Sequence, residues 1–129
     1  MVKRILSMAL LLSLLLSLGI SASADWDGAY RCVPKLSFSG SSASCTASIA
    51  PSEASAKVTA SMTLYRVNSN GTLSTCASWP SKTGTGYLSF SQKHSSARSG
   101  NTYRLVISGT VKDSTGTHPI HAYRQAKCP

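Results

Sequence analysis

The stretch from Gly100 to Lys112 constrains the fold more than any other part of this 129-residue chain. Apolar side chains recur in it at every second position, with only Gly109 interrupting the alternation: Tyr103, Leu105, Ile107 and Val111. A period of two is typical of a β-strand that lies with one face on a hydrophobic core. Turn-forming residues stand on both sides, at Ser99-Gly100 and at Asp113–Gly116. We therefore expect one long strand here, with the rest of the chain packed around it.

Six shorter segments repeat this alternation and bring the expected number of strands to seven. In chain order the expected strands are Cys32–Phe38, Cys45–Ile49, Val58–Leu64, Leu73–Trp79, Leu88–Phe90, Gly100–Lys112 and Thr117–Lys127. Asn70-Gly71 predicts a hairpin between the third and fourth strands, because both residues tolerate positive φ. Two polar stretches, Pro80–Gly86 and His94–Gly100, are expected to be loops.

Regularly spaced short strands without a helical period predict an all-β fold. The expected architecture is a seven-stranded antiparallel sandwich of the immunoglobulin or fibronectin III kind, with a small barrel as the alternative. Pro34 has no N–H to donate, so it predicts that the first strand lies at the edge of a sheet. Tyr103 stands where sandwich folds of this kind place a corner tyrosine, at the start of the sixth strand.

The first 24 residues have the pattern of a signal peptide. Lys3 and Arg4 supply a positive start, the apolar run Ile5–Ile20 follows, and Ala22-Ser23-Ala24 offers small residues for cleavage before Asp25. The alternative is a membrane anchor, but the run is shorter than the roughly 20 apolar residues that a span needs. We therefore expect a secreted, extracellular protein in which residues 25–129 form a single domain, with no membrane span after cleavage.

Four cysteines lie in the part that we expect to be exported: Cys32, Cys45, Cys76 and Cys128. An even count in a small exported domain predicts two disulfides. A zinc site is the rival reading, and no Cys-x-x-Cys pair supports it. The sequence does not choose among the three possible pairings. We favour Cys32–Cys45, which would link successive strands, with Cys76–Cys128, which would tie down the C-terminus.

The expected mature chain is basic. It carries eleven of the 13 Lys and Arg residues and all four Asp and Glu residues, which gives a net charge of +7. Such a balance favours contact with anionic polymers or surfaces. The basic residues are spread singly along the chain and form no run, so the alternative is ordinary solvated surface charge.

No motif in the chain indicates catalysis, a metal or a cofactor. The four acidic residues, Asp25, Asp27, Glu53 and Asp113, are too few and too scattered to predict a catalytic pair. No Gly-x-Ser-x-Gly elbow surrounds a serine. His118 and His121 are three residues apart, so on a strand their rings face opposite sides. We expect a protein that is not an enzyme, with no catalytic, metal-binding or cofactor-binding residues.

Aromatic and basic side chains are the best candidates for a binding surface. Flat aromatic rings stack on sugars or bases, and arginine pairs with carboxylate or phosphate. The candidate residues are Trp26, Tyr65, Arg66, Tyr87 and Arg104, with Tyr30, Trp79 and Lys82 in a wider set. The alternative is that Trp79 belongs to the core and the tyrosines are ordinary strand residues.

Part of the chain resembles a known group of proteins. The residues that carry the resemblance are Leu73–Trp79, Leu88, Phe90, Gly100–Arg104 and Gly109-Thr110-Val111. This spacing resembles small secreted β-sandwich proteins of gut clostridia, a domain family of unknown function, over the stretch from Leu36 to Tyr123. Members often have an apolar residue and an extra Trp where this chain has Cys76 and Leu73. The resemblance implies a Gram-positive exported protein and brings no catalytic residues with it.

These patterns predict an exported, non-enzymatic binding module for surface glycans or surface proteins. The loops and faces of sandwich folds are commonly used for recognition, and this support is an analogy. The alternative function is a cationic effector that acts on membranes or the cell wall, which the charge of +7 favours. An inhibitor that uses an exposed Pro80–Gly86 loop has no positive motif. No nucleic-acid partner is expected.

Overall fold

The computed structural model describes residues 22–23, 25–26 and 28–129. The predicted signal peptide, residues 1–24, lies outside the described residues apart from Ala22–Ser23, which form the short strand β1. A second short strand, β2, is Asp25–Trp26. Within the described part of the chain, no helix is long and apolar enough to cross a membrane. The main body of the fold begins after these two strands, at Tyr30.

Seven long strands make up most of the described chain. They are β3 (Tyr30–Ser39), β4 (Ser42–Pro51), β5 (Lys57–Val67), β6 (Leu73–Thr85), β7 (Leu88–His94), β8 (Thr102–Asp113) and β9 (Gly116–Lys127). Each coincides with one of the seven expected strands, and β8 is the stretch on which the sequence argument rests. The alternation of apolar residues therefore identified every long strand correctly.

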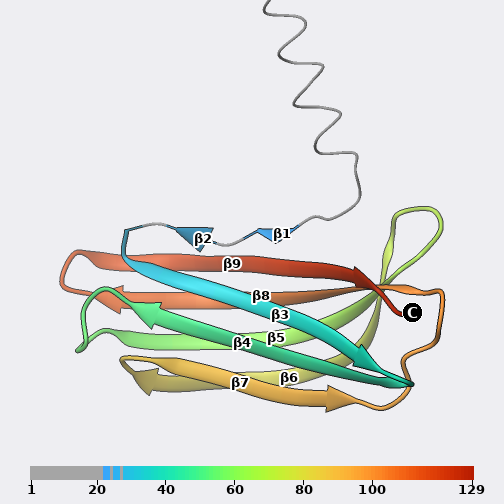
Figure 1. Cartoon of the computed structure of the whole chain (residues 1–129). Coiled ribbons are helices and arrows are strands. Elements are labelled where there is room, and N and C mark those ends of the chain that lie inside the picture. The colour runs from blue at the N-terminus through green and yellow to red at the C-terminus, as the bar shows by residue number, and fades with distance from the viewer. Residues whose placement is uncertain (1–21, 24, 27) are drawn as a thin grey trace, which may run out of the picture.

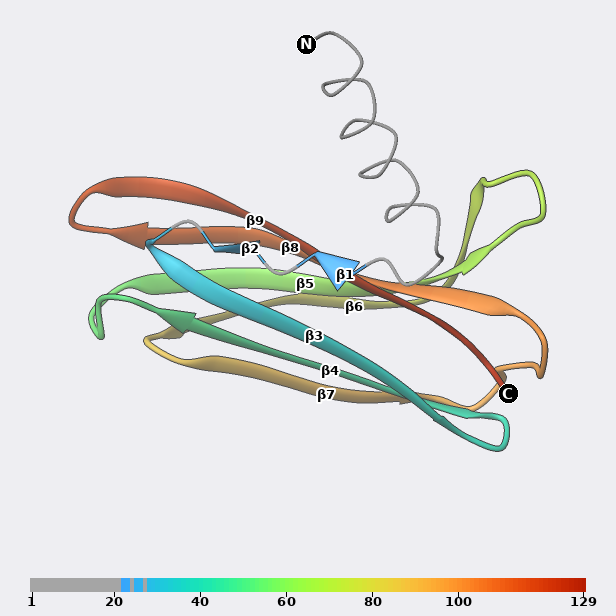
Figure 2. The ribbon, with the colours of Figure 1, turned by 45° about the horizontal axis from the view of Figure 1, so that its top comes forward.

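The strands form two antiparallel sheets that lie face to face (Figure 1). Sheet A has the order β1-β9-β8-β5-β6, and sheet B has the order β2-β3-β4-β7. Figure 2 shows the same two layers from a second direction, with the turns gathered at the two ends. The predicted all-β antiparallel sandwich is confirmed, and the two separate sheets exclude the small barrel.

The two long sides of the sandwich differ. On one side β3 packs against β9, and the short strands β1 and β2 pair with β9 and β3. Pro34 lies on β3 beyond the residues that β2 pairs with, so it occupies an edge position as predicted. On the other side, β6 ends sheet A and β7 ends sheet B. We call this second side the open side.

β6 is longer than expected because two bulges absorb residues that do not fit a regular ladder. Pro80 and Ser81 together oppose the single residue Ser61 of β5, and Cys76 is an extra residue nearer the start of the strand. A bulge on an edge strand is a place where proline is tolerated. The prediction of a loop over Pro80–Gly86 is therefore wrong, since the strand continues to Thr85.

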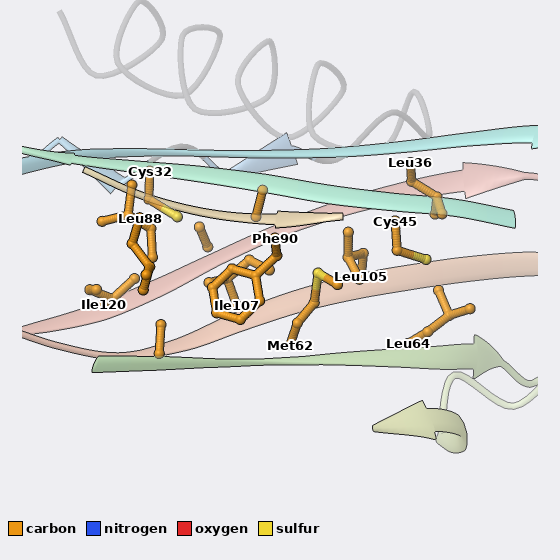
Figure 3. Packing of buried hydrophobic residues seen from close by; sticks show 14 of the residues in the cluster. Cys32, Leu36, Cys45, Met62, Leu64, Leu88, Phe90, Leu105, Ile107 and Ile120 are labelled. Carbon is orange, nitrogen blue, oxygen red and sulfur yellow. The ribbon is translucent and has the colours of Figure 1, made fainter. Parts of the chain in front are cut away.

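The core is built from the inward-facing side chains of both sheets (Figure 3). Its largest fully buried apolar side chains are Ile49, Met62, Leu64, Leu105, Ile107, Val58 and Val111. β8 lies between β9 and β5 and supplies three of them. Gly109 interrupts its alternation because a Cβ atom there would lie 2.0 Å from the carbonyl oxygen of Thr59 and 2.6 Å from Cα of Ala60. The backbones of β5 and β8 approach too closely at this point for any side chain.

Two local predictions are confirmed. The Tyr103 hydroxyl accepts a hydrogen bond at 2.8 Å from the backbone N–H of Arg98, five residues earlier, and this is the contact of a corner tyrosine. The Tyr103 ring is buried and packs on Phe38 of sheet B, with ring centroids 5.6 Å apart. The hairpin at Asn70-Gly71 is also present, although only Gly71 has a positive φ, of 86°.

The predicted disulfides are not found, because none of the four cysteines is joined to another by an S–S bond. Cys32 pairs with Ile49 and Cys45 with Leu36, so the two cysteines are four residues apart along the ladder. That separation is about 13 Å, whereas a disulfide joins Cα atoms roughly 4–7 Å apart. Figure 3 shows Cys32 near Leu88 and Cys45 near Leu36, in different parts of the core.

The second favoured pair, Cys76–Cys128, is also incompatible with the fold. Cys76 lies on β6, and Cys128 directly follows β9. Two strands, β5 and β8, lie between β6 and β9 in sheet A. Three strand spacings amount to about 14 Å. Strand order therefore excludes Cys76–Cys128, and the register of β3 against β4 excludes Cys32–Cys45. Sequence spacing reveals neither.

Candidate functional site

The predicted binding residues do not form one surface. Tyr65 of β5 and Arg104 of β8 are direct cross-strand neighbours on the outer face of sheet A. Tyr87 comes just before β7, is 65% exposed, and lies beside the outer face of sheet B. The two sheets pack against each other through their inner faces, so their outer faces point in opposite directions. The predicted residues therefore divide between opposite faces of the molecule.

The other two predicted residues are Arg66, on β5, and Trp26, on β2. Arg66 lies near the end of β5, where its Nε donates a hydrogen bond to Oδ1 of Asn68 at 3.3 Å. The backbone of Trp26 pairs opposite Arg31 of β3, next to sheet B. The side chain of Trp26 is outside the described part of the structure. Arg66 is therefore held by its own hairpin loop and joins neither face.

The outer face of sheet B is a polar surface that strand alternation produces. β3, β4 and β7 bury alternate side chains, so the intervening side chains point away from the core. The register sets these outward residues in three rows: Val33–Ser48–Ser89, Lys35–Thr46–Ser91 and Ser37–Ser44–Lys93. Small hydroxyl groups fill the middle of the face, and longer cationic side chains stand among them.

Two shallow hollows lie on this face because short side chains are flanked by long ones. The first has a volume of about 380 Å³ and is lined by Ala50 together with the longer Arg31 and Tyr87. The second, of about 300 Å³, lies over Thr46 and the serines around it. Val33, Lys35, Ser48 and Tyr87 line both hollows, so the two are continuous.

A third hollow, of about 450 Å³, lies on the open side between β6 and β7. Nζ of Lys82 reaches across from β6, donates a hydrogen bond to the Ser89 carbonyl oxygen at 3.0 Å, and lies 5.7 Å from the centroid of the Phe90 ring. Trp79 lines the same hollow and is half-buried against the core. Its ring therefore has both roles, as part of the core and as a wall of the surface.

A fourth hollow, of about 440 Å³, lies at the other edge of sheet B and is lined by Lys35, Thr46 and Arg124 among others. Shared lining residues join all four hollows into one area, which we call the sheet B surface. The charged, hydroxyl and aromatic residues that line it are Arg31, Lys35, Ser37, Thr46, Ser48, Trp79, Ser81, Lys82, Tyr87, Ser89, Phe90, Ser91 and Arg124. Lys93 lines none of the hollows and stands beside them, in the outer row Ser37–Ser44–Lys93, and we include it in this surface.

Lys35 and Lys93 are cations of this surface that lie far from the acidic side chains that the structure describes. Lys35 and Lys93 make no ion pair with any side chain that the structure describes. The two acidic side chains that it does describe, Glu53 and Asp113, lie together near the β8–β9 turn at one end of the molecule. An anionic ligand would therefore meet Lys35 and Lys93 without displacing a described acidic partner.

The acidic cluster has a structural role. The Glu53 carboxylate accepts hydrogen bonds from the backbone N–H of Ser114, at 2.8 Å, and from its hydroxyl. Oδ1 of Asp113 accepts from the hydroxyl of Thr115 at 2.6 Å and from its N–H at 2.8 Å, and lies 3.1 Å from Nε2 of His118. These contacts, above all the Thr115 hydroxyl, hold the pKa of the Asp113 carboxyl below its usual value. The cluster ties the β8–β9 turn to the β4–β5 loop.

The two histidines of β9 lie on opposite sides of sheet A, as their spacing predicts. His118 turns toward the acidic cluster, while His121 pairs with Ser108 and is exposed on the outer face. Among the residues that the structure describes, no group of three or more His, Cys, Asp and Glu side chains could hold a metal ion.

Sequence reasoning missed most of the sheet B surface. Lys35 and Lys93 are 58 positions apart in the chain, and the pairing of β3, β4 and β7 brings them onto one face. One local signal was present, because Arg31, Val33 and Lys35 alternate with buried residues and so share an outward face. The neighbours of that face depend on strand order, which no local pattern records.

No protein-family model and no curated protein sequence matches the chain. Among solved structures, it is similar to the solution structure of a candidate late embryogenesis abundant (LEA) protein, with 14% sequence identity and a TM-score of 0.45. The similarity covers 90% of this chain and 75% of the other. A likeness of this size says nothing about function.

Proposed function

We propose that the chain is an exported, non-enzymatic binding module of the immunoglobulin or fibronectin III kind that binds anionic polysaccharides through the sheet B surface. The observation that carries this proposal is the continuous run of four shallow hollows with cationic and aromatic walls. The signal-peptide pattern and the resemblance to secreted clostridial proteins support the exported location.

The chemistry of the surface suits a polysaccharide. Sugar hydroxyls exchange hydrogen bonds with short polar side chains such as Thr46, Ser48 and Ser91, which line the middle of the face. Tyr87 offers an exposed ring against which the apolar face of a sugar can pack. Lys35 and Lys93 supply charge for carboxylate or sulfate groups. The outward residues of β4 from Ser44 to Ala50 extend over about 20 Å, which favours a chain ligand over a small one.

A cationic effector that inserts into membranes is less well supported. Only two large hydrophobic side chains of the described residues are exposed, Leu73 at 39% and Tyr87 at 65%. They belong to different sheets, so they do not combine into an apolar patch that could enter a bilayer. Binding to anionic vesicles would then rest on charge alone, and it serves as an alternative outcome of the test.

Two charge-reversal variants of the full chain test the proposal. One variant is Lys35→Glu with Lys93→Glu on the sheet B surface. The matched control is Lys57→Glu with Lys112→Glu, a cross-strand pair of lysines on the outer face of sheet A. Each variant replaces two lysines, so both have the same net charge, and only the position of the change differs.

Binding to polygalacturonate and to dextran sulfate is measured by titration calorimetry at low salt, with neutral dextran as the uncharged polymer. We expect at least about tenfold weaker binding for the sheet B variant, a small effect for the control, and steep weakening of both complexes with salt. Equal loss in the two variants would mean that total charge decides binding and would contradict the proposal. Binding to anionic vesicles without binding to either polysaccharide would favour the membrane effector.

A further inference from the structure

Arg104, at the centre of a second polar area on the outer face of sheet A, is held in a defined orientation. Its Nε donates a hydrogen bond to Oε1 of Gln125 on β9 at 2.9 Å. Its Cζ lies 5.1 Å from the centroid of the Tyr123 ring, a cation–π contact. Tyr65 lies directly opposite on β5. The guanidinium therefore has a partner on one neighbouring strand and a tyrosine on the other.

The terminal amino groups of Arg104 have no acceptor among the described residues. Its hydrogen bond and its ring contact both leave these two groups unused. Asp113 is nine residues further along β8, about 30 Å away, and Glu53 lies beside the same turn as Asp113. A half-buried arginine with a fixed plane and no carboxylate partner presents a planar pair of donors that matches two oxygen atoms.

The groups around Arg104 indicate the kind of ligand. Thr102 and Lys127 form the next cross-strand pair of this face, and both are polar. Tyr65 and Tyr123 are half-buried and offer rings with hydroxyl tips. The two terminal amino groups of the guanidinium match the two coplanar oxygens of a carboxylate in a bidentate pair.

We infer that Arg104, Tyr65, Tyr123 and Gln125 form a second binding site, which takes the carboxylate of an acidic sugar residue. Arg104 would donate from its terminal amino groups to the two carboxylate oxygens, and Tyr65 would pack against the sugar ring. Gln125 is a positioning residue, since it holds the arginine by Nε. This inference rests on the proposed function, because it names uronic acids as the sugar class and adds a site for them.

The position of this site has a consequence for the whole module. Sheet A and sheet B lie back to back, so the Arg104 site and the sheet B surface face in opposite directions. One molecule would then hold two polysaccharide chains, one on each face. The module would cross-link an acidic polymer in addition to binding it.

The test uses the full chain and a single monosaccharide, galacturonate, with its neutral methyl ester as the matched ligand. Titration is followed by ¹H–¹⁵N NMR, which includes the Nε–H signal of Arg104. We expect the signals of Arg104, Tyr65 and Tyr123 to shift with galacturonate, with saturation at millimolar concentration or below, and to remain unchanged with the ester. Equal shifts with the ester would overturn carboxylate recognition.

Three variants complete the test. Arg104→Gln is expected to abolish the shifts at this site, and Arg104→Lys to weaken binding at least about fivefold, because lysine lacks the planar donor pair. Arg98→Gln, which removes the same charge from an exposed loop, should leave the site unchanged. Unchanged galacturonate binding in Arg104→Gln would refute the inference.

The outcome is separable from that of the proposed function. If polygalacturonate binds through the sheet B surface and galacturonate leaves Arg104 unshifted, only the second site is wrong. If the Arg104 signals shift while charge reversal at Lys35 and Lys93 has no effect, the second site stands and the sheet B surface is wrong.

Discussion

At the scale of the residue, Gly109 occupies a position where the packing of two strands leaves no room for a side chain. It is the position at which β8 and β5 come closest, and a methyl group there would meet the backbone of Thr59 and Ala60. Backbone atoms of a paired strand cannot rotate away as a side chain can. The only relief is a separation of the two strands.

Gly109→Ala is therefore expected to lower the free energy of unfolding by at least about 3 kcal/mol, the upper end of overpacking effects. Ser108→Ala is the control, since Ser108 is the adjacent residue and faces solvent. It should change stability by less than about 0.5 kcal/mol. Urea unfolding followed by tryptophan fluorescence measures both. Equal stability of Gly109→Ala and the wild type would refute the close approach of these strands.

Tyr103 tests a single hydrogen bond. Tyr103→Phe keeps the buried ring and removes the hydroxyl that accepts from the N–H of Arg98. Removing the acceptor of this backbone N–H is expected to lower the free energy of unfolding by about 1–2 kcal/mol. Hydrogen exchange at the Arg98 amide should also become faster. Tyr123→Phe on the outer face is the control. An unchanged exchange rate at Arg98 would show that the corner contact does not protect this amide.

At the scale of the element, the β8–β9 turn depends on the Asp113 carboxylate. Hydrogen bonds from Thr115 keep the pKa of Asp113 below its unfolded value. A carboxyl with a lowered pKa stabilises the folded state above pH of about 4, where the unfolded group is ionised. This stabilisation is lost as the pH falls through the lowered pKa.

We expect Asp113→Asn to destabilise the protein at pH 7 and to flatten the part of the stability–pH profile below pH of about 4. Urea unfolding at a series of pH values measures this. Glu53→Gln, which changes the other carboxylate of the cluster, is the comparison. A profile for Asp113→Asn as steep as that of the wild type at acid pH would assign the acid sensitivity to another group.

The four cysteines differ in how accessible their thiols are in the folded protein. Cys76 is half-buried at the bulge of β6, while Cys32, Cys45 and Cys128 are buried, and burial raises the pKa of the Cys45 thiol to about 11. Alkylation without reductant should modify Cys76 first in the native protein and all four thiols in denaturant. Cys76→Ser should abolish the native reaction. Protein that takes up no label in denaturant would contain disulfides and would contradict the cysteine positions in this structure.

The alternation of apolar residues predicted the long strands but not which strands are neighbours. Alternation over β8 and its neighbours predicted every long strand, because burial of one strand face places an apolar residue at every second position of the sequence. The loop prediction after Trp79 failed, because an edge bulge accommodates Pro80 without ending the strand. The cysteine pairs failed for a different reason. Cys76–Cys128 depends on which strands are neighbours, and Cys32–Cys45 depends on the register of two neighbouring strands. Both are decided by the packing of the whole sandwich.

At the scale of the whole molecule, charge is distributed unevenly. The acidic side chains that the structure describes lie together at one end, and the described charged side chains that line the sheet B surface are all cationic. Residues predicted as one binding surface divide between the two faces, with Tyr87 on sheet B and the pair Tyr65 and Arg104 on sheet A. This division separates the proposed polymer surface from the carboxylate site.

The proposed function requires an anionic polysaccharide to lie along the outer face of sheet B. The most direct measurement is a ¹H–¹⁵N NMR titration of the ¹⁵N-labelled protein with a short oligogalacturonate. We expect the amide signals of Lys35, Thr46, Ser48, Ser89 and Ser91 to shift together and saturate, and salt to reverse the shifts. Signals of these five residues that remain unchanged while the oligomer binds elsewhere would contradict the claim.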